Sequence, residues 1–352
     1  MLTLVSLRLK TADSTQNADK MPIVSAKQKT DEAVKSIAQF QSGQIKPIST
    51  GFEWLDKHLL GGFLPSTIMT IGGLSNHGKT YLMQKLENYV LDTSEDVVLL
   101  RCNWESAVYK LLLRKITQKT NMKMSEVLFN LPEGKNLEDI KEICQQERRD
   151  GLFYSEEPVT ACQFGEEVAT FLQSNIDKKV MITIDHVGLV KGREKSEIDA
   201  LFEEMNKLKK MHPYVFFVPL MQLKRDLLDR VGNHPSEAPR QLDFYGSDQL
   251  FQLSDLVMAV YNPYKVGAVG KYMVFSKYGY EYVDMEFIVE GGGKYNHFKP
   301  EGNYFYHMLK SRDIEDMEGF EDVWVEKLFD VREPEDVDKT SEEVNDSLED
   351  IL

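Results

Sequence analysis

The chain has little of what secreted, metal-binding or membrane-spanning proteins need. Its 352 residues include three cysteines, Cys102, Cys144 and Cys162, and their spacing matches no metal-ligand pattern. Such sparse cysteine use is typical of a reducing compartment. No apolar run is long enough to cross a bilayer. The first ten residues lack the basic leader, long apolar run and cleavage site of a signal peptide. We therefore expect a cytoplasmic protein with no membrane partner.

The chain also has fewer basic residues than acidic ones. The formal net charge is −15, which excludes a general coat of basic surface for nucleic acid, although a local basic loop or channel could still bind it. The charge is uneven, because residues 333–352 hold nine acids against one lysine. Such tails are usually solvated and disordered. The few apolar residues at the tip of this tail leave open a second role, as a tether for a replication partner.

One glycine-rich stretch has a recognisable pattern. Residues 73–80 fit G-x-x-x-x-G-K-[ST], between a short apolar strand at 67–71 and a helical pattern that opens at Tyr81. A strand, a glycine-rich turn and a helix N-terminus direct backbone N–H groups and the helix dipole at phosphate. In such a P-loop, Lys79 reaches the β- and γ-phosphates and the Thr80 hydroxyl holds Mg²⁺. We expect His77, a lone histidine in the loop, to face solvent.

Apolar runs alternate with helical segments along the rest of the chain, which predicts an α/β fold with a parallel sheet covered on both faces. The expected strands are 67–71, 97–100, 151–154, 180–185, 215–222, 255–261, 305–308 and 323–329. The expected helices are 31–40, with Thr30 as its N-cap, 108–119, 164–174 and 196–211. The small helix at 31–40 has one apolar face, and either folds back on its own domain or docks on a neighbouring subunit.

Ligands bind at the carboxyl ends of parallel strands, and three polar residues stand there. Asp185 closes an apolar run, where a P-loop enzyme places the acid that holds Mg²⁺ through water. Glu105 is a candidate general base; its alternative is an N-cap or first-turn acid of the next helix. Gln222 either senses the γ-phosphate or hydrogen-bonds a strand end.

Residues from about 30 to 330 resemble the motor domain of DnaB-like replicative helicases, the RecA-fold hexameric family. The segments that carry the resemblance, in order, are 50–56, the P-loop 73–80, 103–106 with 111–114, 184–190, 220–225, 243–261 and 310–312. The resemblance implies a RecA-like P-loop fold and a homo-hexameric ring that hydrolyses ATP with Mg²⁺ between subunits. Beyond what the family pattern implies, we expect extra antiparallel strands at the C-terminal edge of the sheet.

The resemblance also implies roles for single residues. Lys79, Glu105 and Gln222 would act in catalysis, and Arg312 would act as an arginine finger from the neighbouring subunit, with Lys310 beside it. Thr80 and Asp185 would hold the metal. The nucleotide would contact Gly73, Leu74, Ser75, Asn76, His77, Gly78, Lys79, Thr80 and Tyr81.

Single-stranded DNA is the substrate that the resemblance implies, bound by loops that face a central channel. The candidate contacts are Lys191, Arg193, Lys195, Lys224, Arg225, Arg230, Arg240, Gly246 and Ser247. The loops also carry acids, so ordinary solvated charges are the alternative reading of the basic residues.

The chain departs from the family pattern at both ends. The expected organisation is a flexible arm (1–28), a linker helix that could dock on a subunit (29–48), the motor domain (49–331) and an acidic tail (332–352) that could bind primase, polymerase or a loader. We expect the protein to lack the family's N-terminal domain, and a tyrosine-rich segment (264–306) is longer than the family pattern predicts. Extra edge strands or a base-stacking surface would explain that segment.

A streamlined, virus-encoded enzyme acting in a bacterial cytoplasm fits these features. A filament-forming recombinase and a non-unwinding nucleotide-switched scaffold are the alternative functions.

Overall fold

The computed structural model describes residues 24–146, 148–212, 214–233, 239–245, 248–262, 271–276, 279–284, 303–311 and 323–327. The chain divides into two compact units, residues 1–46 and 47–352. The expected acidic tail lies outside the described residues, and so does most of the expected N-terminal arm.

Helix α1 (Ala26–Gln41) is the described element of the first unit. It begins five residues earlier than predicted: the cap is Ser25, whose side chain accepts the N–H of Gln28 at 3.2 Å. The prediction of Thr30 as N-cap is wrong, because its hydroxyl donates back to the Ala26 carbonyl inside the helix. No residue of α1 is buried, and the apolar side chains of Val34, Ile37 and Phe40 are exposed.

The second unit contains one sheet, to which the described residues contribute ten strands in the order β3-β2-β4-β5-β1-β6-β9-β10-β7-β8. The first six strands in this order are parallel, as predicted. Their bounds are β1 (Thr67–Gly73), β2 (Val97–Asn103), β3 (Leu152–Ser155), β4 (Lys179–Asp185), β5 (Val215–Gln222) and β6 (Leu256–Tyr261). The P-loop strand β1 therefore lies between β5 and β6.

Antiparallel pairing begins beyond β6. Strand β9 (Asn303–Ser311) pairs antiparallel with β6, and β10 (Val323–Lys327) pairs antiparallel with β9. Strands β7 (Lys271–Ser276) and β8 (Gly279–Asp284) form an antiparallel pair at the edge. These strands confirm the expected antiparallel edge. The rest of the tyrosine-rich segment lies outside the described residues, and the base-stacking alternative remains untested.

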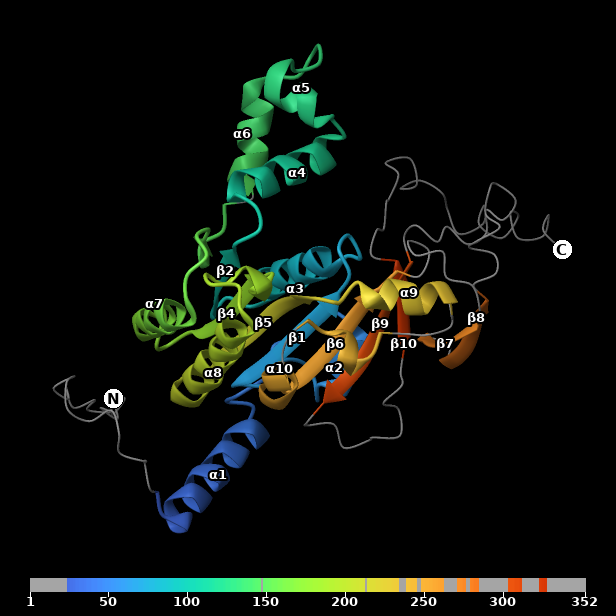
Figure 1. Cartoon of the computed structure of the whole chain (residues 1–352). Helices are drawn as coiled ribbons and strands as arrows, with labels where there is room; N and C mark the ends of the chain where they lie inside the picture. The colour runs from blue at the N-terminus through green and yellow to red at the C-terminus, as the bar shows by residue number, and fades with distance from the viewer. Residues whose placement is uncertain are drawn as a thin grey trace, which may run out of the picture. The chain divides into compact units, whose positions relative to one another are not determined.

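Helices cover both faces of the parallel strands (Figure 1). On one face α3 (Lys79–Thr93) and α2 (Glu53–His58) pack over Met69, Ile71 and Leu220. On the other, α7 (Ala161–Ser174) and α8 (Lys195–Met211) pack over Ile68 and other alternate strand residues, next to α10 (Asp248–Leu253). The remaining helices are α4 (Val108–Thr120), α5 (Met124–Phe129), α6 (Leu137–Gln146), α9 (Asp226–Asn233) and two short 3₁₀ helices, η1 (Val187–Leu189) and η2 (Gln241–Asp243). Burial on both faces explains why these strands are apolar throughout.

Candidate nucleotide and nucleic-acid sites

The P-loop follows a strand in which every residue is buried. Gly78 caps α3 with φ +87°, a conformation that glycine adopts without strain. The Lys79 ammonium donates hydrogen bonds to the carbonyls of Gly73 (2.9 Å) and Leu74 (2.8 Å). The loop thus closes around its own lysine at the N-terminus of α3, where backbone N–H groups favour an anion.

Lys79 lies in an environment that disfavours its charge. Burial lowers the pKa of its ammonium to about 8, while the carboxylates of Asp185 and Glu105 oppose that shift. A bound phosphate would add negative charge beside the ammonium and favour its charged form. The lysine is therefore suited to an anionic ligand.

Asp185 is the last residue of β4 and is 4% exposed. Its Oδ1 accepts a hydrogen bond from the Thr80 hydroxyl at 3.1 Å. Burial raises the pKa of Asp185, and nearby Arg101 is the strongest influence in the opposite direction. A hydroxyl and one carboxylate beside a phosphate cradle fit Mg²⁺, which needs few protein ligands when phosphates and waters supply the rest.

Glu105 lies just beyond β2 and lines the same cavity of about 570 Å³ as Lys79, Thr80 and Asp185. The alternative role as a helix cap does not hold. Ala107 is the N-cap residue of α4, whose first turn has no acid, and the Val108 N–H is satisfied by Glu156 at 2.7 Å. Glu105 is exposed and faces the space where a nucleotide would lie, as a candidate base requires.

Gln222, at the end of β5, connects the P-loop to a second cavity. Its amide donates to the Ser75 hydroxyl at 2.9 Å. Both Gln222 and His186 line the nucleotide cavity and a neighbouring cavity of about 990 Å³. His186 adopts φ +73°, which is uncommon for a residue with a side chain.

His77 does not face solvent as expected. It is 4% exposed, stacks on Tyr261 with ring centroids 5.7 Å apart, and accepts the Asn262 N–H at its Nδ1 (3.0 Å). The P-loop therefore packs against the end of β6 through His77. The other expected nucleotide contacts line the cavity, apart from Gly73 and the buried Leu74.

Several residues that line the nucleotide cavity were missed from the sequence. They are Gln84 of α3, Ser106 before α4, His186 after β4, and three residues of α4, Leu111, Arg114 and Lys115. The helical positions of Gln84 and the α4 residues were predicted, and Arg114 was noted on its helix. The cavity wall formed by α4, however, depends on a long-range approach between elements, which a local pattern does not report.

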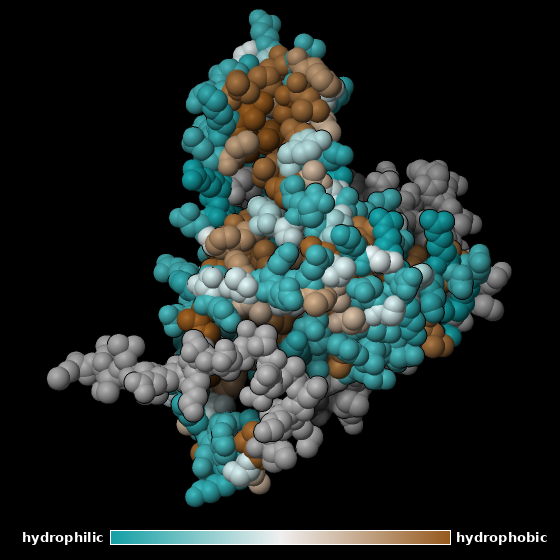
Figure 2. Space-filling view, turned by 60° about the vertical axis from the view of Figure 1, so that its left-hand side comes forward, coloured by the Kyte–Doolittle hydropathy of each residue, from teal (hydrophilic) through white to brown (hydrophobic). Residues whose placement is uncertain are grey.

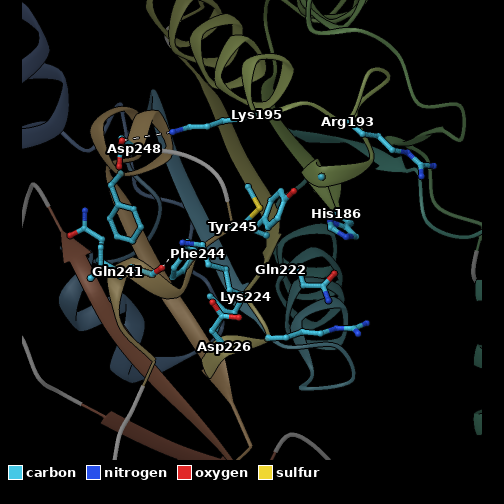
Figure 3. Close-up of a pocket in the computed structure, with 16 residues that line it drawn as sticks. His186, Arg193, Lys195, Gln222, Lys224, Asp226, Gln241, Phe244, Tyr245 and Asp248 are labelled. Atoms are coloured by element: carbon cyan, nitrogen blue, oxygen red, sulfur yellow. Dashed lines mark hydrogen bonds and ion pairs between the residues drawn. The ribbon is translucent and has the colours of Figure 1, made fainter. Parts of the chain in front are cut away.

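The larger cavity is lined by Arg193, Lys195, Lys224 and Arg225, with two acids, Asp226 and Asp248 (Figure 3). Lys195 lies 3.9 Å from Asp248, and the Lys224 ammonium donates to the Leu242 carbonyl at 2.9 Å. The lining also includes the exposed Tyr245 and the buried Phe244. Cations next to an aromatic ring are the usual combination for single-stranded nucleic acid.

Phe244 also connects this cavity to the P-loop strand. A Cβ atom at Gly72 of β1 would lie 2.3 Å from Cζ of the Phe244 ring. Only glycine leaves room for this contact, so the wall of the larger cavity rests directly on the strand that leads into the P-loop.

The other expected nucleic-acid contacts are placed differently. Arg230 makes a bidentate ion pair with the buried Asp243, with both hydrogen bonds at 2.7 Å. The backbone N–H of Arg240 donates to the same carboxylate at 2.6 Å. Lys191 is exposed, and its backbone N–H donates to the Val159 carbonyl. Gly246 and Ser247 lie outside the described residues.

Lys310 of β9 is held within its own chain. Its ammonium donates to the carbonyls of Phe251 and, at 2.6 Å, Ser254, near the end of α10. Strand β9 ends at Ser311, immediately before Arg312, which lies outside the described residues. The expected trans-acting pair therefore remains a prediction.

The fold and the site define a RecA-like P-loop nucleotide-binding domain. The sequence model of the family described as DnaB-like helicase C terminal domain matches residues 47–277. Because this match covers well over half of the chain, the chain belongs to that family, and the resemblance seen in the sequence is confirmed. No curated protein sequence matches it.

Two solved structures share the fold. One is a DnaB-like replicative helicase described with its interactions with primase, with 16% identity and a TM-score of 0.58 over 84% of this chain and 63% of that one. The other is described as the ATPase domain of a second protein, with 15% identity and a TM-score of 0.60 over 84% of this chain and 97% of that one. The chain thus spans less than two thirds of the first relative and nearly all of the second. None of its described helices is long and apolar enough to cross a membrane.

Proposed function

We propose that the chain is a ring-forming motor that hydrolyses ATP with Mg²⁺ to translocate on single-stranded DNA and unwind duplex DNA. The observation that carries this proposal is the pairing of the two cavities. One contains the P-loop, Asp185 and Glu105; the other is lined by cations; and Gln222 and His186 belong to both. A change at the nucleotide could therefore reach the nucleic-acid surface through these two shared residues.

Each residue of the nucleotide cavity has a defined task in this proposal. Lys79 and the P-loop backbone bind the phosphates, and Glu105 orients and deprotonates the attacking water. Thr80 and Asp185 hold Mg²⁺, which neutralises charge on the phosphates when bound. We assign Gln222, whose amide donates to Ser75 of the P-loop, to the terminal phosphate. Arg312 of a neighbouring copy completes the site by stabilising charge in the transition state.

Assembly into a ring, which we propose to be a hexamer, requires surfaces that copies can bury. Helix α1 exposes Val34, Ile37 and Phe40. The α4–α6 group exposes a second apolar area, seen in brown at the top of Figure 2, that includes Met124, Leu128, Phe129 and Leu137. We propose that α1 of one copy docks on a neighbouring copy. Phe40→Asp should then lower the oligomeric mass measured by light scattering, whereas Lys35→Asp, on the same exposed helix, should not.

Hydrolysis of ATP by the purified protein tests the motor function. We expect single-stranded DNA to stimulate the wild type, and Glu105→Gln and Arg312→Ala each to abolish turnover. Mixing the two variants should restore part of the activity, because mixed rings contain interfaces with both residues intact. Nucleotide binding without DNA-stimulated turnover in the wild type would contradict a motor.

The acidic tail gives a separate test: removing residues 333–352 should keep ATP hydrolysis and weaken binding of a primase, polymerase or loader.

A further inference from the structure

Three polar side chains are buried beneath the nucleotide cavity. Glu87 comes from α3, Arg101 from β2 and Thr183 from β4, and none is more than 4% exposed. The Thr183 hydroxyl donates to one Glu87 oxygen at 2.6 Å, and Arg101 Nη1 lies 3.2 Å from the other. We refer to these three residues as the buried polar cluster. It joins the P-loop helix to the two strands that end in the site.

The strand register places the cluster directly behind Asp185. Thr183 lies opposite Arg101 in the β2–β4 ladder, and Asp185 lies opposite Asn103. Residues two apart on a strand share a face, so Thr183 and Asp185 both face α3. Thr80 and Glu87 are two helical turns apart on α3 and therefore also share a side. The same helix thus makes two hydrogen bonds to the same strand, Thr80–Asp185 at 3.1 Å and Glu87–Thr183 at 2.6 Å.

The Arg101 guanidinium has donors beyond those used in its ion pair with Glu87. Its Nε and Nη2 atoms are buried and have no hydrogen-bond partner among the described residues. Arg101 is held by Glu87, which in turn accepts a hydrogen bond from Thr183 on the strand that carries Asp185.

Stability alone does not explain charged groups at this depth. The same face of the sheet is otherwise packed with apolar side chains such as Leu86, Leu99 and Met181. Buried ion pairs replaced by apolar groups of similar volume are often as stable or more stable. A role in the geometry of the site would account for the cluster, because its members contact the helix that carries Thr80 and the strand that carries Asp185.

We propose that Glu87, Arg101 and Thr183 are positioning residues that hold Asp185 against Thr80, so that these two side chains together bind the Mg²⁺ of a bound nucleotide. The inference rests on the nucleotide-binding function proposed above. Residues that orient metal ligands through hydrogen bonds typically change metal affinity when they are removed. The cluster should therefore act on the metal and leave phosphate binding by the P-loop in place.

The test measures the affinity of a fluorescent non-hydrolysable ATP analogue with and without Mg²⁺. In Glu87→Leu/Arg101→Met, we expect the melting temperature to equal or exceed that of the wild type. The affinity without Mg²⁺ should stay unchanged, and the gain in affinity on adding Mg²⁺ should fall by about tenfold or more. A folded double variant that keeps the wild-type gain would overturn the proposal.

A milder pair keeps the proposal testable if the double variant does not fold. Thr183→Val removes the hydroxyl and keeps the shape, whereas Thr183→Ser keeps the hydroxyl bond to Glu87. The valine variant should lose part of the Mg²⁺-dependent gain and the serine variant should retain it. Equal gains in the two variants would count against positioning.

A second buried ion pair supplies the control. Lys209 Nζ lies 2.7 Å from Asp255 Oδ2, at the junction of α8 and β6. Lys209→Met/Asp255→Asn should keep the Mg²⁺-dependent gain. An equal loss of gain in this control would refute a specific role of the cluster. A wild-type protein that binds the analogue with no gain from Mg²⁺ would instead refute the proposed function, so the two failures are distinguishable.

Discussion

The amide of Gln222 donates a hydrogen bond to the hydroxyl of Ser75 across 2.9 Å, which joins the end of β5 to the P-loop. Because Gln222 also lines the cationic cavity, this bond is a direct polar connection between the sites of the two proposed ligands.

This relationship gives a first prediction, measured as the ratio of ATP turnover with and without single-stranded DNA. Gln222→Ala should lower that ratio by about tenfold, the order expected when one polar contact of a coupling element is lost. Ser75→Ala should lower the ratio as well, because it removes the acceptor. The double variant should be no worse than Gln222→Ala, since residues that share one bond are not additive. Additive losses would show that the bond does not couple the sites.

Charge at the larger cavity gives a second prediction. Arg225→Ala should weaken binding of an oligothymidine strand and reduce the slope of log affinity against log salt by about 0.7, the value for one lost phosphate contact on a single strand. Lys207→Ala is a matched control, because Lys207 is an exposed cation of α8 that pairs with Glu204. A slope unchanged by Arg225→Ala would remove this arginine from the DNA surface.

Arg230 gives a third prediction, in which a substitution lowers the stability of the fold and leaves the salt dependence of DNA binding unchanged. Replacing Arg230 with Met leaves the carboxylate of Asp243 buried without its bidentate ion-pair partner. We expect the free energy of unfolding, measured with urea, to fall by about 2 kcal/mol, because the buried carboxylate of Asp243 loses its two hydrogen bonds from the guanidinium. At the same time the salt slope for DNA binding should be unchanged. A stable Arg230→Met variant with a reduced salt slope would make Arg230 a DNA ligand, as the sequence suggested.

Cysteine chemistry gives a fourth prediction. Burial raises the pKa of the Cys102 thiol to about 12, whereas Cys144 and Cys162 are exposed. A raised pKa leaves almost no thiolate at pH 8, and the thiolate is the reactive form. A thiol reagent at pH 8 should therefore modify two cysteines quickly in the native protein and three after denaturation. Rapid modification of three thiols in the native state would contradict the burial of β2.

Much of the fold followed from the sequence, because its central strands are buried on both faces and so form continuous apolar runs. Strand β1 was expected at 67–71 and spans 67–73, and the predicted end of β5 at Gln222 is confirmed. Asp185 and Thr80 were expected to meet, since the P-loop pattern carries its own geometry.

The errors and omissions involve contacts between distant parts of the chain. His77 was expected to face solvent, but its partners, Tyr261 and Asn262, are some 185 residues away. Glu87 and Arg101 were not singled out in the sequence, because only the packing of α3 on the sheet brings them together. Helix α1 was predicted too short, because a threonine inside a helix looks the same in sequence as one that caps it.

The absence of a side chain at Gly72 has a spectroscopic consequence. The Phe244 ring lies against β1 and also forms a wall of the cationic cavity, so its electronic surroundings include both the P-loop strand and any strand of DNA. A fluorine atom placed on that ring would give one resonance sensitive to both. Titrating nucleotide and DNA separately, then together, would show from a single nucleus whether the two occupancies are independent.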